Sequence, residues 1–166
     1  MKAVIALGSN LGNSFETLQG ALDVLFDAPG LVFTDVSPVY ETDPVGGPEQ
    51  DVFLNAVVLA ETALEPHALL ERAQSVENAF GRVRAERWGP RTLDVDLIVV
   101  GDVVVDDELL TLPHPRAHER AFVLAPWLAV DPQAALPGHG EVAGLLAALD
   151  DQGVRRREDL VLQGPQ

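Results

Sequence analysis

The sequence has no cysteine, which excludes disulfide bonds and thiolate metal sites. It also has few cations: 11 Lys and Arg stand against 26 Asp and Glu, so the formal net charge is −15. That charge argues against a nucleic acid or an anionic membrane as a partner. No apolar run approaches a membrane span, and the apolar start is interrupted at Gly8, too early for a signal peptide. We therefore expect a cytoplasmic protein; the sequence does not identify protein partners.

The order of apolar patterns predicts an α+β fold. The 166 residues, 47% of them hydrophobic, are enough for one domain with a real core. We expect strands over 3–7, 31–40, 53–61 and 93–100, with helices over 14–27 and 66–80. The resulting βαββαβ order is ferredoxin-like, an antiparallel sheet with two helices on one face.

A C-terminal extension follows this predicted core. Its pattern favours a short strand over 103–105 and helices over 115–128 and 142–149. We expect a single domain over residues 1–150 and a polar, loosely held tail over 151–166.

The scarce cations are concentrated where two aspartates follow. Arginines at 82, 84, 87 and 91 share a loop with Gly89 and Pro90, and the next strand carries Asp94 and Asp96. Guanidinium groups bind phosphate oxygens, and carboxylates two residues apart share one strand face, which suits Mg²⁺ shared with phosphates. The alternatives are a solvated loop and a half-exposed strand. Because aspartate is depleted in strands, we favour a metal site and phosphoryl or pyrophosphoryl transfer.

Other candidates are weaker when taken alone. Phe53 and Asn55 share a strand face and could stack on and hydrogen-bond to a flat heterocycle, but spacing alone favours a core Phe and a satisfied Asn. Gln74 and Glu77 are neighbours on a helix and read as an ordinary polar face. His114 is either a phosphate donor or a turn residue.

Taken in order, these segments resemble the hydroxymethyldihydropterin pyrophosphokinase family of folate biosynthesis. The resemblance covers about residues 2–132, through segments 8–12, 40–44, 53–56, 112–115 and 120–124. Its most specific segment is Arg87-Trp88-Gly89-Pro90-Arg91-Thr92-Leu93-Asp94-Val95-Asp96. The resemblance implies a catalytic domain that transfers pyrophosphate from ATP to the hydroxymethyl group of 6-hydroxymethyl-7,8-dihydropterin, releasing AMP.

The resemblance also implies a role for each matching residue. Two Mg²⁺ ions on Asp94 and Asp96, with catalytic Arg82 and Arg91, would neutralise the charge that develops during transfer. The implied ATP-binding residues are Gln74, Glu77, Arg84, Ile98, Thr111, His114 and Arg120. The implied pterin-binding residues are Phe53 and Phe122, which would sandwich the ring, and Asn55, Thr42, Pro44 and Val45, which would read its edges. Trp88 would seal the site within a lid.

One departure and one alternative stand beside this assignment. Leu109 occupies a position where some relatives carry arginine, which removes one candidate ATP contact. The alternative is a ferredoxin-like regulatory module that binds a small molecule without chemistry, since fold alone does not decide function. The paired aspartates and arginine loop favour the enzyme, because a sensor needs no metal bridge.

Overall fold

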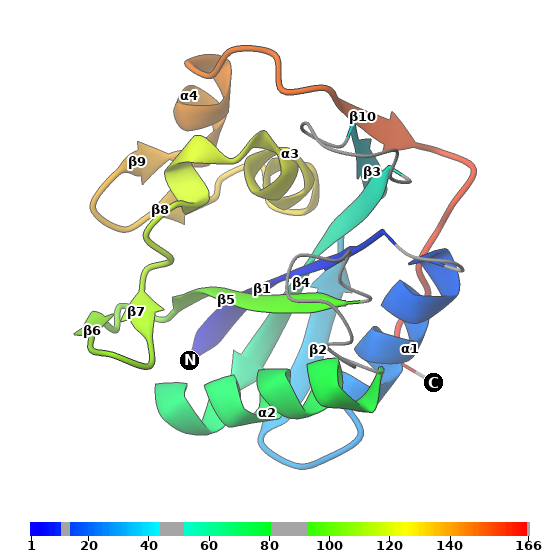
Figure 1. The fold of residues 1–166 in the computed structure, drawn as a ribbon. Coiled ribbons are helices and arrows are strands. Elements are labelled where there is room, and N and C mark those ends of the chain that lie inside the picture. Colours follow the sequence, from blue (N-terminus) through cyan, green and yellow to red (C-terminus); the bar gives the residue numbers. More distant parts are fainter. Residues whose placement is uncertain (11–13, 44–51, 81–92, 166) are drawn as a thin grey trace.

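The computed structural model describes residues 1–10, 14–43, 52–80 and 93–165 (Figure 1). Six residues predicted to form the site lie outside these ranges: Arg82, Arg84, Trp88, Arg91, Pro44 and Val45.

The centre of the fold is an antiparallel sheet. β1 (Lys2–Ser9) pairs with β4 (Phe53–Thr62) on one side and with β5 (Asp94–Val100) on the other. β2 (Leu31–Val36), β3 (Val39–Thr42) and β10 (Val154–Arg157) complete the sheet, in which β2 also pairs with β4 and the main order is β10-β3-β4-β1-β5. This strand arrangement matches the antiparallel sheet that the sequence predicts.

The single strand predicted over 31–40 is in fact two strands. The break falls at Ser37 and Pro38, between β2 and β3. Proline has no N–H to donate to a strand ladder, which favours an interruption here. The Ser37 hydroxyl instead accepts a hydrogen bond from the Val57 backbone N–H at 2.8 Å, so β4 remains bonded opposite the break.

Helices cover both faces of the sheet: the two helices of the predicted core share one face, as expected, and the helices of the C-terminal extension lie on the other. α1 (Ser14–Leu25) and α2 (Pro66–Ala79) pack on one face, and α3 (Ala121–Val130) and α4 (Val142–Ala147) lie on the other (Figure 1). The side chains of β1 alternate accordingly: Ile5 belongs to the first core cluster and Val4 to the second. Two buried faces explain why β1 is apolar almost throughout.

The C-terminal half departs most from prediction. The helix expected over 115–128 is a short 3-10 turn, η1 (Ala117–Glu119), followed by α3, and Arg120 between them has extended backbone angles. The strand expected over 103–105 is β6 (Val105–Asp106), which pairs with β7 (Thr111–Leu112). A further hairpin joins β8 (Ala135–Leu136) to β9 (Gly140–Glu141).

The prediction of a loosely held tail is wrong. Residues 154–157 form β10, which pairs with β3, and the Leu162 side chain is buried in the first core cluster. The Gln163 backbone N–H also donates to Gln19 Oε1 at 2.8 Å. The proposed domain boundary at residue 150 itself stays a prediction. None of the helices within the described ranges is long and apolar enough to cross a membrane.

Candidate active site

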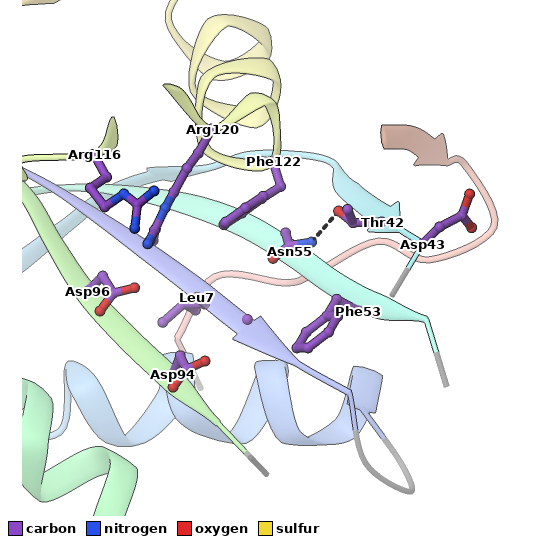
Figure 2. A pocket seen from close by; sticks show the side chains of 12 residues that line it. Leu7, Thr42, Asp43, Phe53, Asn55, Asp94, Asp96, Arg116, Arg120 and Phe122 are labelled. Atoms are coloured by element: carbon purple, nitrogen blue, oxygen red, sulfur yellow. Dashed lines mark hydrogen bonds between the residues drawn. The ribbon is translucent and has the colours of Figure 1, made fainter. Parts of the chain in front are cut away.

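A pocket of about 710 Å³ lies between the sheet and the start of α3 (Figure 2). Its walls come from β1, from β3 and β4, from β5, and from the start of α3 with the segment that leads into it. The polar and aromatic lining residues are Thr42, Asp43, Phe53, Asn55, Asp94, Asp96, Arg116, Arg120 and Phe122. The sequence predicts all of these as site residues except Asp43 and Arg116. The fold thus brings together residues that are far apart in the chain.

The carboxylates of Asp94 and Asp96 point into this pocket from one face of β5 (Figure 2). Val95 between them points the other way, into the core cluster under α1 and α2. Across the ladder, Gly8 pairs with Asp94 and Ala6 with Asp96. Small residues therefore neighbour both aspartates across the ladder, and all four residues line the pocket.

Glu77 approaches β5 from the opposite side. Its buried Oε2 accepts a hydrogen bond from the Val95 backbone N–H at 2.9 Å. β5 pairs only with β1 within the described part of the sheet, so the carboxylate satisfies an amide on the open edge. Glu77 thereby anchors the strand between the two aspartates, a role that its sequence position does not reveal. Its predicted contact with ATP remains a prediction.

The Asn55 side chain is held in one orientation. Its Nδ2 donates to Thr42 Oγ1 at 2.8 Å, and both residues are buried. A Cβ atom on Gly8 would lie only 3.1 Å from Asn55 Oδ1, so glycine gives the amide room. Phe122 extends from α3 toward the strand that carries Asn55 and Phe53 (Figure 2). An amide flanked by two aromatic residues suits a flat ligand with polar edges.

His114 is a neutral hydrogen-bond donor. Its Nδ1 accepts a hydrogen bond from the Arg116 backbone N–H at 3.1 Å. Burial, helped by the positive charges of Arg120 and Arg116, lowers the pKa of His114 from 6.5 to about 4. A neutral imidazole whose Nδ1 accepts must carry its proton on Nε2. His114 can therefore donate through Nε2–H to a ligand oxygen at neutral pH.

A second, smaller pocket of about 250 Å³ lies beside β5 and includes Thr111, His114 and the exposed Leu109. Asp96 lines this pocket as well as the larger one, so the two pockets are neighbours that share this residue.

Two predicted ATP-binding residues are placed elsewhere. The Ile98 side chain is buried in the second core cluster, and its carbonyl accepts from the His114 backbone N–H at 2.8 Å. Gln74 is exposed on α2 and lines neither of these two pockets. Their contacts with ATP remain predictions.

Arg116 is one of the two polar lining residues, with Asp43, that the sequence prediction leaves out. Arg116 and Arg120 both line the larger pocket (Figure 2). On the surface, the Arg116 Nε donates to Glu119 Oε2 at 3.4 Å. The scarcity of cations in this chain is the signal that could have drawn attention to it.

Comparison with known proteins decides the family. The model of 7,8-dihydro-6-hydroxymethylpterin-pyrophosphokinase matches residues 4–132. The chain belongs to this pyrophosphokinase family. A 2-amino-4-hydroxy-6-hydroxymethyldihydropteridine pyrophosphokinase of Mycobacterium tuberculosis is 48% identical over 162 residues, covering 90% of this chain and 84% of the relative. The pyrophosphokinase of the same name from Bacillus subtilis is 43% identical over 153 residues, covering 92% and 88%.

Solved structures agree with the fold of this chain. The wild-type HPPK-DHPS protein of Plasmodium falciparum, solved with pteroate, superposes with a TM-score of 0.66 at 13% identity. The match covers 88% of this chain and 44% of that one, so the chain spans less than half of the solved protein. At this identity the likeness shows the fold alone: an antiparallel sheet with helices, as described above.

Proposed function

We propose that the larger pocket is where this chain transfers pyrophosphate from ATP to the hydroxymethyl group of 6-hydroxymethyl-7,8-dihydropterin, giving AMP and the pterin diphosphate. The observation that carries the proposal is a single pocket in which Asp94 and Asp96 lie opposite Arg120 and beside Asn55. Family membership supplies the reaction, and the pocket supplies a place for each reacting part.

The aspartate pair is proposed to hold two Mg²⁺ ions. Carboxylate oxygens are the ligands that Mg²⁺ prefers, and it keeps its other positions for water and phosphate oxygens. The described residues offer no cluster of three or more metal-binding side chains, which fits an ion shared with the nucleotide. Bound Mg²⁺ would stabilise negative charge on the transferring group. Asp94 and Asp96 would fix where that charge is met.

ATP is proposed to lie across the second pocket, with its phosphates reaching Asp96. His114 would donate its Nε2–H to a phosphate oxygen, and the Arg120 guanidinium would contribute charge from α3. Thr111 lines the same space. The exposed Leu109 replaces an arginine of some relatives, so the nucleotide would have one less cation there.

The pterin is proposed to lie between Phe53 and Phe122. The Asn55 Nδ2 donates a hydrogen bond to Thr42, and this bond fixes the orientation of the amide. The Asn55 Oδ1 would then accept a hydrogen bond from a pterin N–H. Pro44 and Val45, which follow Asp43 in the chain, would complete the edge recognition. A ring of this kind gains from stacking on both faces.

Three further assignments lie beyond the described contacts. Arg82 and Arg91 are proposed to act on charge in the transition state, Arg84 on ATP, and Trp88 as part of a lid. We also assign the βαββαβ core to the ferredoxin-like class, which the strand order β5-β1-β4 with β2 and β3 beyond supports.

The test mixes the chain with Mg²⁺–ATP and 6-hydroxymethyl-7,8-dihydropterin and measures the AMP and pterin diphosphate formed by chromatography. We expect AMP and pterin diphosphate in equal amounts, and neither product when ATP or pterin is omitted. Binding of both compounds without AMP would overturn the proposal and favour the regulatory module.

A further inference from the structure

The segment 152–157 contacts two walls of the larger pocket, although it lies beyond the residues that the family model matches. Gln152 holds the wall near α3. Its Nε2 donates to the Glu119 carbonyl at 2.9 Å, and its Oε1 accepts from the Ala121 backbone N–H at 2.9 Å. Arg120 lies between these two residues, so one amide side chain fixes the backbone on both sides of a pocket residue.

This contact replaces a missing helix cap. The first N–H groups of a helix have no partner within the helix, and a side chain at the N-cap position usually accepts from one of them. Arg120 occupies that position and makes no capping hydrogen bond. Gln152 supplies the acceptor from a distant part of the chain, and so sets the start of the turn that carries Phe122.

Arg155 holds the opposite wall. Its Nη1 and Nη2 donate to the two carboxylate oxygens of Asp43 at 3.1 and 3.0 Å, and its Nε and Nη2 donate to Glu41 Oε1 at 3.0 and 2.8 Å. Thr42 lies between these two acidic residues and receives the hydrogen bond from Asn55. The pairing of β10 with β3 places Val154 opposite Thr42 itself.

Gly153 makes the close approach of the two segments possible. Its φ is +72°, a conformation that L side chains rarely adopt, and a Cβ atom there would lie 3.0 Å from Asp43 Oδ2. Its carbonyl also accepts from the Asp43 backbone N–H at 3.4 Å. The last described residue before segment 44–51 is thus held through both its backbone and its side chain.

These ion pairs contribute more to geometry than to folding. The Arg155 side chain is 49% exposed and that of Asp43 is 57% exposed, and exposed ion pairs add little to stability. A guanidinium that grips both oxygens of a carboxylate nevertheless fixes the orientation of that group. Removing Arg155 should therefore disturb the pocket wall more than the fold.

We propose that Gln152 and Arg155 are positioning residues for substrate binding. Together they fix the position of the α3 wall of the pocket relative to the β3 wall. The inference rests on the proposed function, since pterin is the ligand that must fit between these walls. Arg155 acts through Asp43 and Thr42 on the pterin side. Gln152 acts through the backbone around Arg120, and hence on both Arg120 and Phe122.

The experiment uses the full chain with Gln152→Ala, Arg155→Ala and Arg155→Lys, and Arg156→Ala as the control. Arg156 is exposed on the same strand and makes no side-chain hydrogen bond among the described residues. Calorimetry measures the Kd of an inert ATP analogue with Mg²⁺, then the Kd of pterin in its presence, and the melting temperature is recorded for each variant.

We expect Arg155→Ala to raise the pterin Kd about tenfold with little change for the nucleotide, because small displacements of positioning groups are costly. Arg155→Lys keeps the charge without the bidentate grip and should fall between. Gln152→Ala should raise both Kd values, and Arg156→Ala neither. Asp43→Ala combined with Arg155→Ala should add little to either single change, because the two residues act as one unit.

Three outcomes would overturn the inference: an unchanged pterin Kd in Arg155→Ala, equal losses for both ligands in that variant, or additive effects in the double variant. Failure of the wild-type chain to bind pterin would instead overturn the proposed function. Should Arg155→Ala not fold, Arg155→Lys gives the same comparison with the positive charge retained.

Discussion

The carboxylate of Glu77 accepts a hydrogen bond from the backbone N–H of Val95 at 2.9 Å, and Val95 separates the two aspartates of the pocket. Helix α2 is thereby tied to the one stretch of β5 whose side chains are proposed to hold Mg²⁺. The contact is buried, since only 7% of Glu77 is exposed. A residue on the α2 side of β5 can thus influence the positions of the two aspartates that project from the other face of the strand.

Glu77→Ala should raise the Mg²⁺ concentration needed for half-maximal activity. The unpaired Val95 amide should also lower the free energy of unfolding by about 1–3 kcal/mol. Activity titrated with Mg²⁺, beside chemical denaturation, measures both effects. Glu77→Gln keeps a side-chain acceptor, so its Mg²⁺ requirement should stay close to that of the wild type. Glu71→Ala, an exposed change on the same helix, should alter neither the Mg²⁺ requirement nor the free energy of unfolding. A lower stability with an unchanged Mg²⁺ requirement would limit Glu77 to a structural role.

Asp94→Ala and Asp96→Ala should each reduce turnover by about a thousandfold. The bound ions are expected to stabilise the negatively charged transition state by several kcal/mol. Both side chains are partly exposed at the pocket, so the fold should survive, as circular dichroism would show. Asp102→Ala removes an exposed carboxylate just after the same strand and serves as control. Near-normal turnover in either pocket variant at ordinary Mg²⁺ would refute the metal assignment.

Asn55→Ala should weaken pterin binding by about 1–3 kcal/mol, because a polar edge of the ring is left unpaired in the pocket. The Kd of the ATP analogue should hardly change. Thr42→Val removes only the hydroxyl that orients the amide, so its effect on pterin should be smaller than that of Asn55→Ala. Calorimetry that finds equal losses for the two ligands would point to a general structural role.

His114 should make the stability depend on pH only in acid. Its folded pKa of about 4 lies below its ordinary value of 6.5, because burial and nearby arginines disfavour the charged ring. The unfolded chain therefore binds the proton more tightly, so the His114 contribution is complete above about pH 6.5 and is lost as the pH falls toward 4. Between those limits the wild type should lose unfolding free energy more steeply than His114→Gln. Parallel pH profiles would contradict the shift.

Sequence patterns were sufficient to foresee which side chains of the regular elements share a face and meet in one pocket, although their roles stay predictions. Asp94 and Asp96 alternate with core residues on a strand, so their shared face follows from the two-residue period, and Phe53 and Asn55 follow by the same rule. The rule holds as far as Ile98 and fails after it, where β5 is irregular: the register with β1 shifts, so Val99 joins Ile98 in the second core cluster and Val100 enters the first. A local period cannot foresee such an irregularity.

The tail could not be foreseen for a different reason. β10 is a basic run without apolar alternation. Its Arg155 forms ion pairs with Asp43 and Glu41, which precede it in the sequence by 112 and 114 positions. Glu77 illustrates the same limit, because its partner is a backbone amide and backbone amides leave no signature in the sequence. Contacts that depend on distant pairing become visible only when the sheet is assembled.

The sheet separates two apolar clusters that have no residue in common among the described positions. The larger pocket lies on the side of α3, so a bound substrate would bridge the sheet and that layer. Local opening of α3 can then occur while the cluster under α1 and α2 stays closed, as cooperative units of unequal stability allow. Saturating ligands should therefore slow amide hydrogen exchange in α3 and β10 far more than in α1. Bound substrate would then stabilise the α3 layer against local opening, in addition to taking part in the reaction.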